Sequence, residues 1–160
     1  MNINDVDWLD PRAKITEQGN FIVKEALWLQ QWLICHKPSD EEKENILAMA
    51  TAMEGVREVL GCRIYVHSWM RPGKFDCEGH RYHGMNYNVF VGSTAGKSGH
   101  LFGKAVDFHG ADFIGTDRCA KAREKLEPHL KRLGLRMENR AGDWVHVDIM
   151  PVGNRRFFIP

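Results

Sequence analysis

The strongest hydrophobic pattern in the chain follows Pro38. Ser39 and Glu42 are spaced as in a capping box, in which a serine and a glutamate three residues later bond the first free amides of a helix. Apolar residues then recur at helical spacing, at Ile46, Ala50, Met53, Val56 and Leu60. Because Gly61 is suited to end a helix, the pattern predicts an amphipathic helix from residue 39 to 60.

Two other stretches have helical spacing. One follows Asn20, which can cap a helix, and has apolar residues at Ala26, Leu27, Trp28, Trp32 and Leu33. We expect residues 1–19, which precede it, to have no regular secondary structure. The other stretch starts near Thr116, packs through Leu126, Leu130 and Leu133, and ends at Gly134. Pro128 lies inside it and predicts a kink, because proline has no amide hydrogen to donate.

Alternating apolar and polar residues predict four strands. Residues 62–70 place Ile64, Val66 and Ser68 on one face and Tyr65, His67 and Trp69 on the other. Residues 104–109 direct Ala105, Asp107 and His109 one way and Lys104, Val106 and Phe108 the other. Residues 135–139 and 144–149 predict a hairpin with a tight turn at 140–143. In its second strand Val145 and Val147 form the core side, opposite Trp144, His146 and Asp148.

The order of these elements predicts the class of fold. Helix, helix, strand, long loop, strand, helix and hairpin follow one another without a repeat or a linker. This order is typical of an α+β domain in which helices cover one face of a mainly antiparallel sheet. We expect residues 1–160 to form a single domain, long enough for a hydrophobic core, with its site on the open face of the sheet.

Composition narrows the possible partners. With 22 basic and 21 acidic residues the net charge is +1, which argues against a nucleic-acid partner. The four cysteines, Cys35, Cys62, Cys77 and Cys119, form no CxxC pair, so free thiols are expected rather than a zinc ribbon. Residues 1–5 lack the basic charge of a signal peptide, and no apolar run could span a bilayer. We expect a monomer that is made in the cytoplasm and does not insert into membranes.

The candidate chemistry centres on His100 and Asp107. They are seven positions apart, and the glycines at 99 and 103 allow a turn before the strand that carries Asp107. If the strand of His146 lies beside it, two imidazoles and one carboxylate point into the same pocket. Three protein ligands with a fourth position open are typical of a catalytic zinc site, although other first-row ions fit the same donors.

Charged residues near these ligands are candidates for catalysis. Asp143, three residues before His146, could take a proton from a metal-activated water and pass it to a leaving amine; the competing reading is a turn residue that caps its own backbone. Glu138 is the competing base. Arg71 could bind a substrate carboxylate or a developing oxyanion, or be an ordinary solvated charge.

Several other side chains could complete the site. His67 and His109 lie beside proposed ligands and are candidates for hydrogen-bond partners or an alternative base. Trp69 and Trp144 could wall a substrate groove. Cys77, His80 and His83 have spacings that a second metal could use, but an exposed loop with incidental histidines is the favoured reading.

Several of these segments resemble the zinc D-Ala-D-Ala metallopeptidases, whose fold is shared with the Hedgehog signalling domain. Ser98, His100, Gly103, Ala105 and Asp107 match the S-x-H-x-x-G-x-A-x-D signature of that family. Residues 143–146 resemble its second signature, an acidic residue followed after two spacers by a zinc-binding histidine. Residues 68–71 resemble the strand end that supplies an arginine, and residues 88–92 resemble the N-x-x-V-G segment before the first ligand.

The resemblance implies one zinc ion bound by His100, Asp107 and His146, with Asp143 as general base. It also implies that Arg71 binds substrate or transition state, and that Ser98 orients or contacts substrate. Family members hydrolyse peptidoglycan stem peptides as D-Ala-D-Ala carboxypeptidases or dipeptidases, or as endopeptidases that include phage endolysins cutting the L-Ala-D-Glu bond. Two alternatives stay open: a zinc-containing binding module without turnover, and an intracellular D-Ala-D-Ala dipeptidase.

The chain departs from the family pattern in two places. Many members have glutamate at the position of Asp143, and residues 72–87 form an insertion that we expect at the rim of the site. The insertion weakens the assignment of Asn88 and is expected to reshape the substrate groove. A phage or prophage lysis protein, or a virion protein released to the cell wall, fits a chain without a signal peptide.

Overall fold

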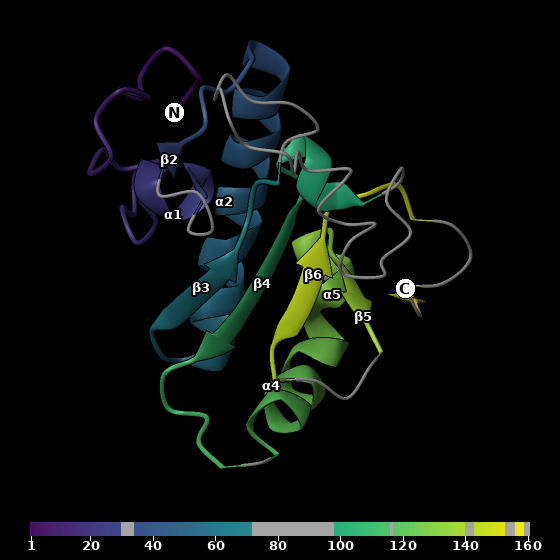
Figure 1. Ribbon diagram of the computed structural model, residues 1–160. Helices are drawn as coiled ribbons and strands as arrows, with labels where there is room; N and C mark the ends of the chain where they lie inside the picture. The colour runs from purple at the N-terminus through teal and green to yellow at the C-terminus, as the bar shows by residue number, and fades with distance from the viewer. Residues whose placement is uncertain (30–33, 72–97, 116, 140–142, 153–155, 159–160) are drawn as a thin grey trace.

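A five-stranded sheet organises the protein (Figure 1). The computed structural model describes residues 1–29, 34–71, 98–115, 117–139, 143–152 and 156–158. The sheet has the order β3-β4-β6-β5-β7, and its strands are β3 (Ile64–Ser68), β4 (Ala105–Gly110), β6 (Val145–Asp148), β5 (Arg136–Glu138) and β7 (Phe157–Phe158). Only the pair β5–β7 among these is parallel. The predicted α+β class and mainly antiparallel sheet are confirmed, and β7 was not predicted.

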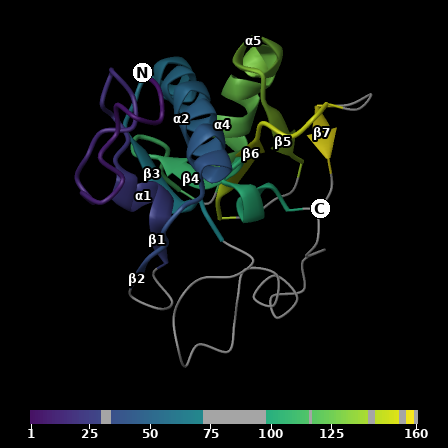
Figure 2. The same ribbon diagram turned by 90° about the horizontal axis from the view of Figure 1, so that it is seen from above.

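Helices cover one face of this sheet (Figure 2). They are α2 (Asp40–Leu60), α4 (Arg118–Leu126) and α5 (Leu130–Leu133). Both α2 and α4 contact β4, and the strand residues that face them are fully buried: Val106, Phe108, Val145 and Val147. The alternation of the strands therefore leaves their other side chains on the open face, as the sequence predicts.

The ends of α2 follow the predicted chemistry. The Ser39 hydroxyl accepts a hydrogen bond from the Glu42 amide at 3.3 Å, and the Glu42 carboxylate accepts one from the Ser39 amide at 2.7 Å. Gly61 ends the helix in the left-handed conformation, with φ of 72°. The free backbone amides at the start of α2 are thus partly satisfied by side chains of the same segment, and the Gly61 amide bonds one of the free carbonyls at its end.

The predicted third helix is confirmed but divided at Pro128. A 3₁₀ turn, η3 (Glu127–His129), separates α4 from α5, because the proline cannot donate the hydrogen bond of a continuous α-helix. Leu126 and Leu130 are buried on either side of the turn, and Gly134 ends α5 with φ of 70°.

The first predicted helix is largely wrong. The helix α1 (Val23–Leu27) has five residues, and the chain then continues into a hairpin of β1 (Trp28–Leu29) and β2 (Ile34–Cys35). Asn20 does not cap it, since its backbone amide and side-chain amide both donate to the Glu54 carboxylate of α2. Trp32 and Leu33 lie outside the described residues. Short apolar runs such as residues 26–29 and 32–35 suit a strand as well as a helix, so periodicity alone could not decide.

Part of the sequence that carried predictions lies outside the described residues. It includes the inserted segment 72–87, with Cys77, His80 and His83, and the segment around Asn88.

Among the described residues, Cys62 and Cys119 have free thiols. Among the described helices, none combines the length and the apolar character needed to cross a membrane.

Candidate metal centre

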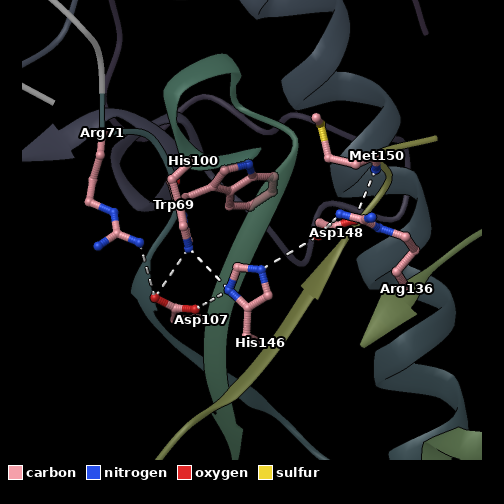
Figure 3. Close-up of polar contacts among 8 residues, drawn as sticks. All are labelled: Trp69, Arg71, His100, Asp107, Arg136, His146, Asp148 and Met150. Atoms are coloured by element: carbon pink, nitrogen blue, oxygen red, sulfur yellow. Dashed lines mark hydrogen bonds and ion pairs between the residues drawn. The ribbon is translucent and has the colours of Figure 1, made fainter. Parts of the chain in front are cut away.

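Three predicted ligands come together on the open face of the sheet (Figure 3). Asp107 of β4 and His146 of β6 are directly opposite each other in the strand register. His100 reaches the same point from η2, a 3₁₀ turn (Gly99–Phe102) that precedes β4. One donor atom from each residue lies within 4.8 Å of the other two, so this group could hold a metal ion.

Small residues let the turn of His100 lie close to the strands. Gly103 has φ of 73°, and both its amide and the amide of Lys104 donate to the Gly99 carbonyl. A Cβ at Gly99 would lie 3.0 Å from the Cβ of Ala105, which is tighter than ordinary packing. Glycine at 99 and alanine at 105 therefore bring His100 over the strand that carries Asp107.

Trp69, which follows β3, holds the His100 side chain and the η2 turn in place through two hydrogen bonds. Its backbone carbonyl accepts a hydrogen bond from His100 Nδ1 at 2.6 Å, and its indole Nε1 donates to the Gly103 carbonyl at 3.0 Å. The Trp69 side chain is 1 % exposed, so the prediction that it walls a groove is wrong. The β3–β4 register shifts between Val66 and Ser68, so the alternation of β3 does not extend to Trp69, whose ring lies in the core.

The donor atoms have spacings close to those of a metal-binding set. His100 Nε2 lies 3.2 Å from His146 Nδ1 and 3.3 Å from Asp107 Oδ2, and His146 Nδ1 lies 2.7 Å from Asp107 Oδ1. Zinc–ligand bonds of about 2.0–2.1 Å at tetrahedral angles place neighbouring donors roughly 3.3 Å apart. The two imidazole nitrogens already have about that separation. The two distances to Asp107 involve different carboxylate oxygens, so binding through one oxygen requires a small adjustment of this carboxylate. The residues present therefore fit a small divalent ion.

Burial and mutual contact shift the pKa of each group. Burial lowers the pKa of His100, more than the Asp107 carboxylate raises it. Burial alone would raise the pKa of Asp107, but the imidazoles of His100 and His146 hold it well below its usual range. Burial alone would lower the pKa of His146, but hydrogen bonds and charges from Asp107 and Asp148 raise it to about 9. Without metal, a proton on His146 therefore balances the Asp107 charge near neutral pH, and a metal ion has to displace it.

Arg71 lies beside this centre. Its Nη2 is 3.7 Å from Asp107 Oδ2, and its backbone amide donates to the His100 carbonyl at 2.8 Å. The side chain is 20 % exposed, so the guanidinium borders both the ligands and the solvent. An arginine in this position can form charge-assisted hydrogen bonds with a carboxylate that approaches the metal centre.

Asp143 and Trp144 lie at the exposed start of β6. Trp144 is 48 % exposed, and the side chains of Arg118 and Arg123 from α4 donate to the backbone carbonyls of Asp143 and Trp144. Within the described part of the chain, no hydrogen bond or ion pair joins the Asp143 carboxylate to the three ligands. Asp143 thus lies just before β6, three residues from His146 along the chain, and makes none of these contacts with the ligands.

The remaining candidates lie around the ligands. His67 and His109 contact each other on the open face, with Nε2 of the first 2.5 Å from Nδ1 of the second. Glu138 lies on β5, opposite Phe158 of β7. Ser98 precedes η2, and its side chain makes no capping hydrogen bond. Their catalytic or substrate-binding roles stay predictions.

Two residues that contact the site were not predicted to belong to it. Asp148 lies 3.6 Å from His146 Nε2, and Arg136 donates two hydrogen bonds to the Asp148 carboxylate. The alternation of β6 places Asp148 on the same face as His146, which was the available signal. Nothing in the pattern of β5 indicated that Arg136 would pair with it.

Fold and site together define a small α+β domain with a buried His-Asp-His group that could hold a metal ion. Comparisons of the chain with protein-family models, with curated proteins and with solved structures found no match.

Proposed function

We propose that this protein is a zinc-dependent peptidase that hydrolyses an amide bond in the stem peptides of bacterial peptidoglycan. The observation that carries the proposal is the spacing of His100, Asp107 and His146, which suits one tetrahedral zinc ion with a free fourth position. The resemblance of residues 98–107 and 143–146 to the zinc D-Ala-D-Ala metallopeptidases, which have a Hedgehog-like fold, supports it further.

Zinc is the metal that suits the donor set best. Imidazole nitrogen is a borderline ligand and carboxylate oxygen a hard one, and both are among the usual protein donors of catalytic zinc. When bound, zinc supplies Lewis acidity to a scissile carbonyl and to water. Burial lowers the pKa of His100, which favours the neutral imidazole and its free lone pair.

The chain's own groups provide the proton transfer and the binding. Asp143 accepts a proton from the attacking water and delivers it to the amine that leaves as the C–N bond breaks. Arg71 binds a substrate carboxylate or the oxyanion that develops on the carbonyl oxygen. Trp144, which is exposed just before β6, packs against the peptide, and Ser98 contacts it from the η2 side.

The two reaction types that suit this arrangement are D-Ala-D-Ala carboxypeptidase and L-Ala-D-Glu endopeptidase. Both substrates carry a carboxylate close to the scissile bond, and Arg71 lies beside the ligand Asp107, where such a group would approach. In this proposal the protein acts on the cell wall as a phage or prophage lysis protein, or as part of a virion.

The test combines metal analysis with digestion of peptidoglycan. The purified protein should contain one zinc per chain and release fragments whose new termini, read by mass spectrometry, name the bond that is cut. Asp143→Asn should retain zinc and lose hydrolysis, whereas Asp112→Asn, a matched change at an exposed aspartate, should keep both. A wild-type protein with neither zinc nor released fragments refutes the proposal.

A second candidate is a zinc-containing module that binds peptidoglycan without turnover. It is favoured by the lack of a hydrogen bond or ion pair between the Asp143 carboxylate and the ligands within the described residues. In that case the wild type contains zinc and sediments with sacculi but releases nothing. Parallel assays with free D-Ala-D-Ala distinguish both candidates from an intracellular dipeptidase, which would cleave the dipeptide and leave sacculi intact.

A further inference from the structure

A buried carboxylate lies behind His146, on the side away from the other ligands (Figure 3). Asp148 is the last residue of β6 and is 2 % exposed, and its Oδ2 lies 3.6 Å from His146 Nε2. The other ring nitrogen, Nδ1, faces Asp107 and His100. The imidazole of His146 is therefore placed between the metal-binding set and a second carboxylate.

Arg136 fixes the orientation of this carboxylate. It lies directly opposite Asp148 on β5, and its Nε and Nη2 donate to the two carboxylate oxygens at 2.7 and 2.9 Å. The Met150 amide donates a third hydrogen bond, to Oδ1 at 3.0 Å. Such a fork holds a carboxylate in one plane, which a single point charge cannot do. The oxygen that faces His146 is Oδ2, which has fewer of these partners.

An aromatic ring of β7 packs against the same pair. The ring centroid of Phe158 lies 4.7 Å from Arg136 Cζ, and it meets the His146 imidazole edge to face at 5.6 Å and 83°. Arg136 and His146 are thus both held by contacts with β7, and the position of Asp148 follows from that of Arg136.

The burial of Asp148 makes this arrangement informative, because its side chain is 2 % exposed whereas that of Arg136 is 23 % exposed. Taking a charge out of water costs about as much as its attraction to a partner returns, so apolar residues in the same space are often equally stabilising. The ion pair is therefore weak evidence that Asp148 serves stability alone. A carboxylate beside a metal-binding imidazole has a specific use, because it accepts the proton of the far nitrogen and so fixes the tautomer.

We propose that Asp148, held by Arg136, is a positioning residue of the metal centre. In the metal-bound protein its Oδ2, which lies 3.6 Å from His146 Nε2 in this structure, accepts a hydrogen bond from the Nε2–H group and leaves the Nδ1 lone pair for the metal. The inference rests on the metal centre of the proposed function. His100 is arranged in the reverse sense, since its Nδ1 hydrogen goes to the Trp69 carbonyl and its Nε2 faces the centre. Each histidine thereby has its own acceptor for the nitrogen that does not bind metal.

The first test requires no substitution. In the zinc-loaded full chain labelled with ¹⁵N, long-range ¹H–¹⁵N spectra of the imidazoles report which nitrogen of each histidine carries hydrogen. We expect the hydrogen of His146 on Nε2 and that of His100 on Nδ1. A hydrogen on Nδ1 of His146 overturns the inference, whatever the variants do.

The second test is Asp148→Asn. Because the asparagine oxygen would pair with Arg136, its NH₂ group would face His146 Nε2 and favour the wrong tautomer. Zinc affinity, measured by competition with a chromophoric chelator, should fall about 10–100-fold, and the visible spectrum of the Co²⁺-loaded form should shift. The matched control is Glu42→Gln, which removes another carboxylate–imidazole contact, to His36 at 3.2 Å, away from the ligands. Zinc affinity should be unchanged in this control.

The outcomes separate this inference from the proposed function. Equal zinc affinity of the wild type and Asp148→Asn overturns the inference alone, and so does equal weakening in Asp148→Asn and Glu42→Gln, which would indicate a general loss of stability. A wild-type protein that takes up no zinc overturns the proposed function as well. If Asp148→Asn does not fold, the imidazole spectra of the wild type decide.

Discussion

Replacing Gly103 with alanine should destabilise the protein more than the same change at Gly61, which is also in the left-handed conformation. Gly103 ends the η2 turn with φ of 73°, and a Cβ there would lie 2.7 Å from Ile46 Cγ1 and 3.4 Å from the Glu42 carbonyl oxygen. Ile46 is fully buried in α2 and has little room to move. Gly61 has nearly the same φ, 72°, but a Cβ at this position would have no atom within 4 Å.

The two positions separate backbone strain from steric overlap. An L-residue in the left-handed region costs roughly 1–2 kcal/mol, and this cost applies to Gly103→Ala and Gly61→Ala alike. Forcing an extra methyl into a packed core adds about 1–3 kcal/mol, and only Gly103→Ala carries this part. We therefore expect a loss of about 2–5 kcal/mol at Gly103 and about 1–2 kcal/mol at Gly61.

Urea unfolding of the two variants and the wild type measures the difference, provided that all three share one m-value. In a double-mutant cycle, Gly103→Ala should cost less in the Ile46→Ala background than in the wild type, because the atom that the new methyl overlaps is then absent. Zinc affinity should fall in Gly103→Ala, since the displaced turn carries His100, and stay the same in Gly61→Ala. Equal losses of stability at the two glycines would refute the steric reasoning.

Three further predictions concern α2 and the metal centre. Ser39→Ala should lower the free energy of unfolding by about 1 kcal/mol in urea titrations, because the N-terminal cap of α2 is lost. Burial alone would raise the pKa of Glu42, but hydrogen bonds to His36 and Ser39 hold it below 4.5. Its contribution to stability should therefore be complete above pH 4.5 and fade as the pH falls, and Glu42→Gln should remove this part of the acid dependence in thermal melts. Because the pKa of His146 is raised to about 9, zinc binding near neutral pH should release a proton from it. Calorimetry in buffers of different ionisation enthalpy should detect that proton, and affinity should weaken about tenfold per pH unit on going from pH 9 to 7.

Local sequence signals predicted the parts of the fold that depend on local contacts. The capping box and Gly61 gave the limits of α2, because the groups that satisfy its ends lie within the same segment. The alternation around Val145 and Val147 placed His146 on the open face, because a strand has only two faces. The three ligands were therefore predictable as soon as two strands could be taken as neighbours.

Contacts between segments that are distant in the sequence could not be predicted from local patterns. Asn20 bonds Glu54 across 34 positions instead of capping a helix, and no local pattern indicates such a partner. The Trp69 ring lies in the core beyond a register shift that depends on the pairing of β3 with β4. The pair of Arg136 with Asp148 arises only from the β5–β6 register, and β7 is too short, at two residues, to show a period.

The register of β4 with β6 has a consequence for the folding of the molecule. Asp107 faces His146 only when Val106 pairs with Val147 and Phe108 with Val145. A slip by one residue would turn His146 into the apolar interior, and a slip by two would move it roughly 7 Å along the strand. The hydrophobic core thus selects the same alignment that assembles the ligands. The amount of metal bound per chain would therefore measure the fraction of molecules with the correct β4–β6 register. A core substitution that loosened this register should lower the metal content before it lowers the helix content.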